Sequence, residues 1–140
     1  MILYVESSAV LAWLLGEPTQ RDVLATLTRA KRLVCSRLTL VEVDRTLHVA
    51  VAIGRIDATE AKTARELLAR VRQQWAVLEL TEQVCRRSGQ RFPQEPVRTL
   101  DALHLASMLE LQSLEPKIQP LTLDQRVREN ALLLGFQPLP

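Results

Sequence analysis

The amino-acid sequence predicts an α/β protein with three layers, in which a mostly parallel central sheet of four to five strands is flanked by helices. Short apolar segments alternate with longer segments of helical periodicity along the whole chain, and this alternation is typical of parallel sheets covered by helices. The first segment, 2–5, is a short apolar run of the kind found in strands buried on both faces. In such sheets functional residues gather beyond the carboxyl ends of the strands, so the residues that follow each strand are the first candidates for a site.

The first half of the chain predicts two strands and four helices. Ser7 or Ser8 is expected to cap the first helix, which directly follows the first strand, and Gly16 is expected to end it. Apolar residues at helical spacing predict the next three helices. These helices cover 20–31, 38–54 and 57–74, and the two strands cover 2–5 and 32–36.

The second half predicts two or three further strands and three helices. A strand over 76–80 precedes a helix that opens at Thr81 and carries several arginines. A loop bracketed by Pro93 and Pro96 leads to an apolar helix that Thr99 is expected to cap and that residues 115–117 break. The last segments are a strand over 118–123 interrupted by Pro120, a helix over 125–134 ended by Gly135, and an edge strand over 136–139.

Length and composition favour one globular domain, residues 1–140. A chain of 140 residues is long enough to bury a core without disulfides or metals. Apolar residues make up 47% and charged residues 24% of the chain, which are ordinary values for a globular protein. The formal net charge of +2 neither requires nor excludes a nucleic-acid partner.

The cysteines and the apolar segments indicate a cytoplasmic protein. Cys35 and Cys85 form no CxxC motif, and both are expected to be buried, reduced thiols. No apolar run approaches the ~18 residues of a membrane span. The first strand has no basic segment before it and is followed at once by Glu6, so it is not a signal peptide.

One acidic residue lies within an apolar segment at the start of a helix. Residues 100–109 are apolar on more than one face, as in helices of a protein core. Asp101 falls in the first turn, where a carboxylate also complements the helix dipole. His104 lies one turn later, and a structural role for it is the simpler interpretation, although it could donate to a carboxylate or to a substrate.

Three more acidic residues fall near helix starts that follow predicted strands: Glu6, Glu42 and Asp124. Some have local explanations, because Glu42 fits a capping box with Thr39 and Asp124 fits a helix N-cap. Together with Asp101, however, they are expected to meet at one edge of the sheet. Gathered carboxylates repel one another and need a cation, and oxygen ligands favour Mg²⁺ or Mn²⁺.

Basic residues and other motifs narrow the chemistry further. Four arginines either bind the phosphates of a nucleic acid or form a solvated surface, namely Arg86, Arg87, Arg91 and Arg98. The chain has no GxSxG nucleophile elbow and no GxxxxGK phosphate loop. These absences argue against a serine hydrolase of that type and against a P-loop NTPase.

Four segments with acidic residues follow one another in an order that matches a known family. Met1–Ala9 resembles its strand-Asp-Ser opening, Thr39–Val43 its second motif, and Leu100–Ala106 its D-A-L-H-L-A segment, the most specific of the set. Leu121–Arg126, followed by Leu134-Gly135-Phe136, resembles the closing motif. The set covers essentially the whole chain and resembles the PIN domain family, in particular the VapC-type toxins of bacterial toxin–antitoxin pairs.

The resemblance implies a PIN-like fold and an endoribonuclease that hydrolyses RNA phosphodiester bonds with Mg²⁺ or Mn²⁺. It also implies an inhibitory antitoxin partner and a homodimer, for which we expect the apolar surfaces of the helices over 20–31 and 38–54 to form the contact. Metal ligation is assigned to three carboxylates, Glu6, Asp101 and Asp124. Glu42 joins them or holds a metal-bound water, and the hydroxyls of Ser7 and Thr122 orient the carboxylates.

One residue departs from the family pattern. The first acidic position is usually Asp, and here Glu6 is longer by one methylene. Because Mg²⁺ requires near-octahedral ligands, the departure predicts a preference for Mn²⁺ and a faster Mg²⁺ reaction in Glu6→Asp. It also leaves open a rival hypothesis, a PIN-like binding module with weakened or absent nuclease activity that acts through RNA or protein binding.

Overall fold

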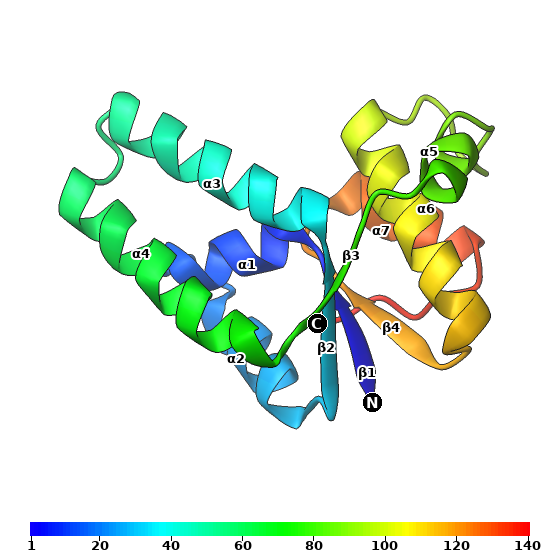
Figure 1. Ribbon diagram of the computed structural model, residues 1–140, viewed down its shortest axis with the longest axis horizontal. Coiled ribbons are helices and arrows are strands. Elements are labelled where there is room, and N and C mark those ends of the chain that lie inside the picture. Colours follow the sequence, from blue (N-terminus) through cyan, green and yellow to red (C-terminus); the bar gives the residue numbers. More distant parts are fainter.

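The computed structural model describes residues 1–140 and has the predicted α/β architecture, with a four-stranded sheet between two groups of helices (Figure 1). All three strand pairings are parallel. In the order β3-β2-β1-β4, the strands are β3 (Ala76–Leu78), β2 (Arg32–Ser36), β1 (Ile2–Val5) and β4 (Ile118–Leu121). Parallel pairing places the carboxyl ends of all four strands at the same edge of the sheet.

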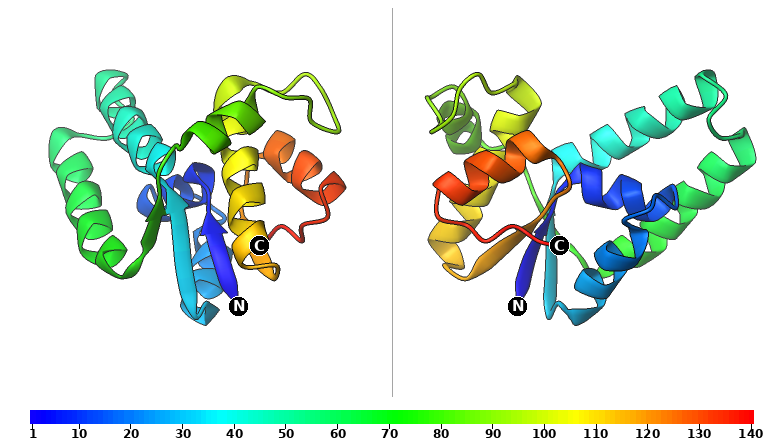
Figure 2. Two further views of the ribbon diagram at one scale, coloured as in Figure 1. Left: turned by 45° about the vertical axis from the view of Figure 1, so that its right-hand side comes forward. Right: turned by 180° about the vertical axis from the view of Figure 1, so that it is seen from behind.

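Helices cover both faces of this sheet. Figure 2 shows α1 to α4 on one side and α5 to α7 on the other. The helices are α1 (Ser7–Leu14), α2 (Gln20–Arg29), α3 (Arg37–Ala52), α4 (Ala58–Val71), α5 (Glu82–Ser88), α6 (Thr99–Leu114) and α7 (Gln125–Leu133), with a short 3-10 helix over Arg72–Gln74. None of them combines the length and hydrophobicity that a bilayer span requires.

Side chains on the two faces of β1 contribute to two separate hydrophobic cores. Leu3 and Val5 are fully buried on the side of α1 to α4, whereas Tyr4 and Val34 belong to the core beneath α6 and α7. This division follows from the strand, because successive side chains point to opposite faces of a sheet. The three-layer prediction is therefore confirmed, and Tyr4 is placed on the face that meets α6.

The carboxyl-terminal tail differs from the prediction. Instead of an edge strand over 136–139, only Leu139 forms a bridge, with Leu121, so the sheet has four strands rather than five. Pro120 lies within β4, where its carbonyl accepts a hydrogen bond from the Leu139 amide at 2.7 Å. Proline cannot donate to a ladder, and an edge strand such as β4 tolerates this loss.

Two helix starts also differ from the prediction. Ser36 caps α3 by accepting a hydrogen bond from the Leu38 amide. Thr39 therefore lies inside the helix, where its hydroxyl donates to the Val5 carbonyl at 3.3 Å, and the predicted capping box with Glu42 is wrong. The first helix is capped by neither serine but by the Glu6 side chain, which accepts from the Ser8 amide.

Three further expectations are corrected on the α5 and α6 side. Arg98, not Thr99, occupies the N-cap position of α6, and its side chain makes no capping bond. Helix α5 ends at Ser88, so Arg91 lies in the following loop. Cys85 is exposed, whereas Cys35 is buried as expected, and burial raises the pKa of its thiol to about 11.

The second core gives a test of the packing. Leu105 of α6 is fully buried in the core shared with Tyr4. Leu105→Ala is therefore expected to lower the free energy of unfolding by about 2–5 kcal/mol, because apolar burial is lost and a cavity is left. Leu114 on the same helix is 72% exposed, and its change to alanine should stay within about 0.5 kcal/mol. Urea denaturation measures both, and equal losses would contradict the described core.

Candidate active site

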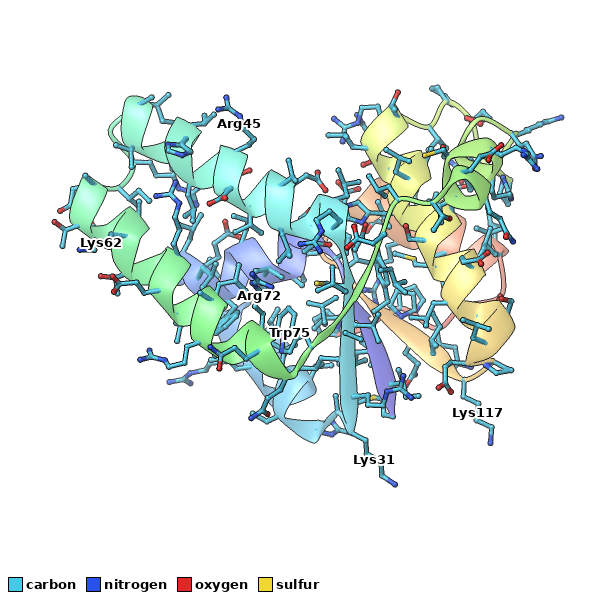
Figure 3. All side chains as sticks on the ribbon, viewed as in Figure 1. Lys31, Arg45, Lys62, Arg72, Trp75 and Lys117 are labelled. Atoms are coloured by element: carbon cyan, nitrogen blue, oxygen red, sulfur yellow. The ribbon has the colours of Figure 1, made fainter.

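Three of the four carboxylates singled out in the sequence lie beyond the carboxyl ends of strands. Glu6 directly follows β1, Glu42 lies in the second turn of the helix after β2, and Asp124 caps the helix after β4. Figure 3 shows Lys31 and Lys117, which precede β2 and β4, at the opposite end of the molecule. The chain thus concentrates acidic groups at one edge of the sheet.

Glu6 is almost completely buried and is held by hydroxyl groups on both oxygens. Ser7 donates its hydroxyl to Oε1 at 2.6 Å, and Thr122 donates to Oε2 at 2.8 Å. The amide of Ser8 also donates to Oε2 at 3.2 Å, as does the Ser8 hydroxyl. These donors stabilise the charged carboxylate and fix its orientation, and they fit the orienting role that the resemblance implies for Ser7 and Thr122.

Glu42 reaches the same cluster from α3. Its Oε1 accepts from the Ser7 hydroxyl at 3.2 Å and from Nε2 of His104. One ligand atom from each of Glu6, Glu42 and His104 lies within 4.8 Å of the other two. The structure thereby brings together two of the predicted carboxylates and a histidine.

Asp101 and Asp124 are joined through Arg98. The Arg98 Nε atom lies 3.2 Å from Oδ2 of Asp101, and its Nη2 atom lies 3.8 Å from Oδ2 of Asp124. The other oxygen of Asp124 caps α7, where it accepts from the amides of Arg126 at 2.9 Å and Val127 at 3.1 Å. The predicted cap is confirmed, and Oδ2 of Asp124 lies towards the Arg98 guanidinium.

The charges in this cluster are crowded. Burial raises the pKa of Asp101, and the nearby charges of Asp124 and Glu6 raise it further, against the opposing hydrogen bond from Arg98. Such a shift means that the ionised form is disfavoured by its surroundings. A divalent cation would relieve the repulsion, and a donor set dominated by carboxylate oxygens fits a hard ion such as Mg²⁺ or Mn²⁺.

The sequence favours a purely structural role for His104, whereas the structure also places it in hydrogen-bond contact with Glu42. It is 1% exposed, and its ring bonds at one nitrogen to the Tyr4 hydroxyl and at the other to Glu42. Burial and the charge of Glu6 raise the pKa of Tyr4 well above its usual value, so that hydroxyl keeps its proton. The spacing Asp101-x-x-His104, one helical turn, was the available signal, because it places both side chains on one face of α6.

The predicted arginines separate into two groups. Arg98 alone contacts the carboxylates. Arg86 pairs with Glu82 at 2.8 Å on the surface of α5, and the guanidinium of Arg87 lies over the Phe92 ring at 4.3 Å. The structure therefore does not bring Arg86 or Arg87 into the acidic cluster.

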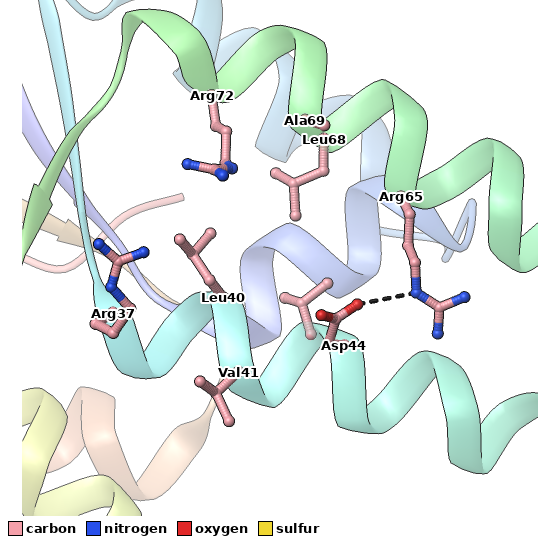
Figure 4. Close-up of a pocket in the computed structure, with 9 residues that line it drawn as sticks. Arg37, Leu40, Val41, Asp44, Arg65, Leu68, Ala69 and Arg72 are labelled. Atoms are coloured by element: carbon pink, nitrogen blue, oxygen red, sulfur yellow. Dashed lines mark hydrogen bonds and ion pairs between the residues drawn. The ribbon is translucent and has the colours of Figure 1, made fainter.

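A groove of about 400 Å³ lies elsewhere, between α3 and α4. Figure 4 shows Arg65 paired with Asp44 at one end and Arg37 and Arg72 at the other. The lining between them is apolar, with Leu40, Val41, Val43, Leu68 and Ala69. Arg37 pairs with Glu79 and Arg65 with Asp44, so this surface is mainly apolar with paired charges at its ends, and it is distinct from the carboxylate cluster.

The surface expected to form a dimer is only partly available. Val23 and Leu27 of α2 pack inside the chain, whereas Leu24 and Ala30 are only partly buried. On α3, Val41, Val49 and Ile53 remain exposed. The predicted dimer contact through these two helices stays a prediction, and α3 offers the larger exposed apolar surface for it.

Comparisons with known proteins agree with the fold. FitAcB from Neisseria gonorrhoeae has a TM-score of 0.71 at 15% identity, covering 100% of this chain and 97% of that chain. VapC20 from Mycobacterium tuberculosis, described as a sarcin-ricin loop cleaving toxin, has a TM-score of 0.69 at 16% identity over 96% of each chain. A comparison with curated proteins gives no match. The family model of the PIN domain matches residues 3–133, and the chain therefore belongs to the PIN domain family.

Proposed function

We propose that this protein is a metal-dependent endoribonuclease of the VapC type, the toxin component of a toxin–antitoxin pair. The observation that carries the proposal is the gathering of four carboxylates, from four separate segments, at the carboxyl edge of a parallel sheet. Glu6, Glu42 and Asp124 follow strands, and Asp101 joins them from α6. Family membership, shown by the match over residues 3–133, supports a nuclease.

We propose that these four carboxylates supply the ligands for Mg²⁺ or Mn²⁺. We assign direct or water-mediated ligation to Glu6, Asp101 and Asp124, with Glu42 as a fourth ligand or as the acceptor for a bound water. When bound, the ion would lower the pKa of a coordinated water and offset the negative charge of a phosphodiester undergoing hydrolysis. Ser7 and Thr122 hold Glu6 in place and limit its rotation.

Arg98 is the residue we assign to the RNA phosphate. Its side chain is 64% exposed and contacts Asp101 and Asp124, so it lies between the cluster and solvent. A guanidinium matches phosphate oxygens with paired donors. Arg86, Arg87 and Arg91 lie outside the cluster and are proposed as outlying contacts to the RNA backbone.

An antitoxin and a second copy of the chain are the proposed protein partners. Solved relatives of the same fold include the VapBC-1 complex of nontypeable Haemophilus influenzae, with a TM-score of 0.65 at 15% identity over 99% of this chain and 96% of that chain. The groove between α3 and α4 suits an antitoxin segment with apolar residues, because five of its nine lining residues are apolar, and Arg72 at its end suits an acidic residue of that segment. We place this activity in the cytoplasm and in one domain, residues 1–140.

Asp101→Asn tests the ligand assignment. We expect RNA cleavage with Mg²⁺ or Mn²⁺ to fall by at least about a hundredfold, because a ligand is lost from the reacting centre. Since the folded state raises the pKa of Asp101, its ionised form destabilises the fold at pH 7, and the variant should melt at the same or a higher temperature. Cleavage and thermal melts measure the two effects.

Asp22 supplies the control for this variant. It lies exposed in the first turn of α2, beside Met1 at the amino end of β1 and not at the carboxyl edge, and its change to asparagine should leave cleavage unchanged. Retention of full activity by Asp101→Asn, with the same RNA and metal, would contradict the role of Asp101 as a ligand.

Glu6 variants test the departure from the family pattern. Sequence alone predicts a faster Mg²⁺ reaction for Glu6→Asp, but the structure changes this expectation because Ser7 and Thr122 hold both oxygens of the longer side chain. Shortening it withdraws the carboxylate from these donors, and a displacement of ~1 Å costs on the order of a hundredfold in rate. We therefore predict lower activity for Glu6→Asp and for Glu6→Gln with both metals, and a Mn²⁺ preference in the parent protein.

The comparison uses three proteins and two metals in one RNA cleavage assay. Equal rates for Glu6→Gln and the parent protein would show that Glu6 acts only as a helix cap.

Metal binding is testable without RNA. An ion that binds only the folded state stabilises it by about 2.7 kcal/mol at a hundredfold excess over its Kd. The antitoxin-free protein should therefore melt at a higher temperature in millimolar Mn²⁺, and EDTA should reverse the shift. A folded protein whose melting temperature stays the same would be evidence against a preformed metal site.

A further inference from the structure

We propose that Tyr4 and His104 form a buried relay that positions the Glu42 carboxylate. The inference rests on the proposed function, because Glu42 matters as a metal ligand or as the acceptor for a metal-bound water. The relay links three elements, since Tyr4 lies on β1, His104 on α6 and Glu42 on α3. His104 is thus a positioning residue for Glu42 and not only a packing residue of the core.

The Tyr4 and His104 side chains of the relay are fully buried. The Tyr4 hydroxyl lies 2.8 Å from Nδ1 of His104, and the two rings meet edge to face, with centroids 6.0 Å apart and planes at 77°. Tyr4 is 0% and His104 1% exposed. At its other nitrogen the imidazole is hydrogen-bonded to Glu42, and this nitrogen lies 3.6 Å from Oε1 of Glu6.

The partner on each nitrogen determines its role. A carboxylate only accepts hydrogen bonds, so Nε2 of His104 carries a hydrogen and donates it to Glu42. In a neutral ring Nδ1 is then an acceptor, and the Tyr4 hydroxyl is its donor. With Nε2 protonated and Nδ1 occupied, the ring has no free lone pair for a metal, so His104 acts through Glu42.

Glu42 has fewer hydrogen-bond donors than Glu6, and His104 is one of them. The side chain of Glu6 is 5% exposed and is held by Ser7, Ser8 and Thr122. The side chain of Glu42 is 22% exposed, and its hydrogen bonds come from Ser7 and His104 alone. Removing His104 would leave one restraint, and Glu42 could then rotate towards solvent, away from the other carboxylates.

Loss of a partner that orients a metal ligand costs about 10–100-fold in metal affinity. We therefore expect His104→Leu to weaken Mn²⁺ binding by that factor, as measured from free Mn²⁺ by electron paramagnetic resonance. His104→Gln keeps an N–H donor of similar reach and should restore most of the affinity. Tyr4→Phe removes only the hydroxyl that orients the ring and should give a smaller loss.

A double-mutant cycle separates positioning from a general effect on the fold. If His104 acts through Glu42, His104→Leu should cause no further loss of Mn²⁺ affinity in the Glu42→Gln background. His48, the other histidine, is exposed on α3, and His48→Leu is the matched control with expected parental affinity. Where His104→Leu does not fold, Tyr4→Phe in both backgrounds completes the same cycle.

The outcomes distinguish the relay from the proposed function. Parental Mn²⁺ affinity in folded His104→Leu, or equal losses in the parent and Glu42→Gln backgrounds, would overturn the relay alone. Absence of Mn²⁺ binding by the folded parent protein would overturn the metal site and the relay together. A loss that requires Glu42 and is restored by His104→Gln supports the relay.

Discussion

Repulsion among carboxylates at one edge of a parallel sheet is the constraint on which the rest of this structure depends. Parallel strands carry Glu6 and Asp124 to the same edge, and α6 adds Asp101 beside them. Burial makes each uncompensated charge more costly. The pKa of Asp101 is raised by burial and by the nearby charges of Asp124 and Glu6, and this direction supports the cation site that we propose.

The surrounding side chains counteract the repulsion in three ways. Hydroxyls of Ser7 and Thr122 donate to Glu6, the guanidinium of Arg98 lies between two aspartates, and His104 donates to Glu42. All of these groups are donors, so a buried acidic cluster can persist in a folded protein without unsatisfied oxygens. The same donors restrict the carboxylates to fixed orientations, which a metal ligand set requires.

Sequence reasoning predicted the fold because strand and helix periodicities agree with the motif order. It failed where tertiary contacts override local rules. Thr39 and Glu42 match a capping box in sequence, but the helix is capped by Ser36, three residues before Thr39. Glu42 therefore makes no capping bond, and its side chain is available to the site. His104 looked like a core residue because its partner Tyr4 is a hundred positions away in the chain, and such long-range pairs have no local signature. The arginines differ in this respect, because Arg86–Glu82 and Arg98–Asp101 are pairs only three or four residues apart in the sequence, and only the tertiary position of α6 brings the second pair to the acidic cluster.

The central claim is that these carboxylates form a metal site. Anomalous diffraction from crystals grown with Mn²⁺, recorded near the manganese edge, tests it most directly. The account predicts an anomalous peak among Glu6, Asp101 and Asp124, with Glu42 as a direct or water-mediated neighbour and His104 still bonded to Glu42. A structure at saturating Mn²⁺ with no peak in the cluster, or with Mn²⁺ bound only elsewhere on the molecule, would contradict it.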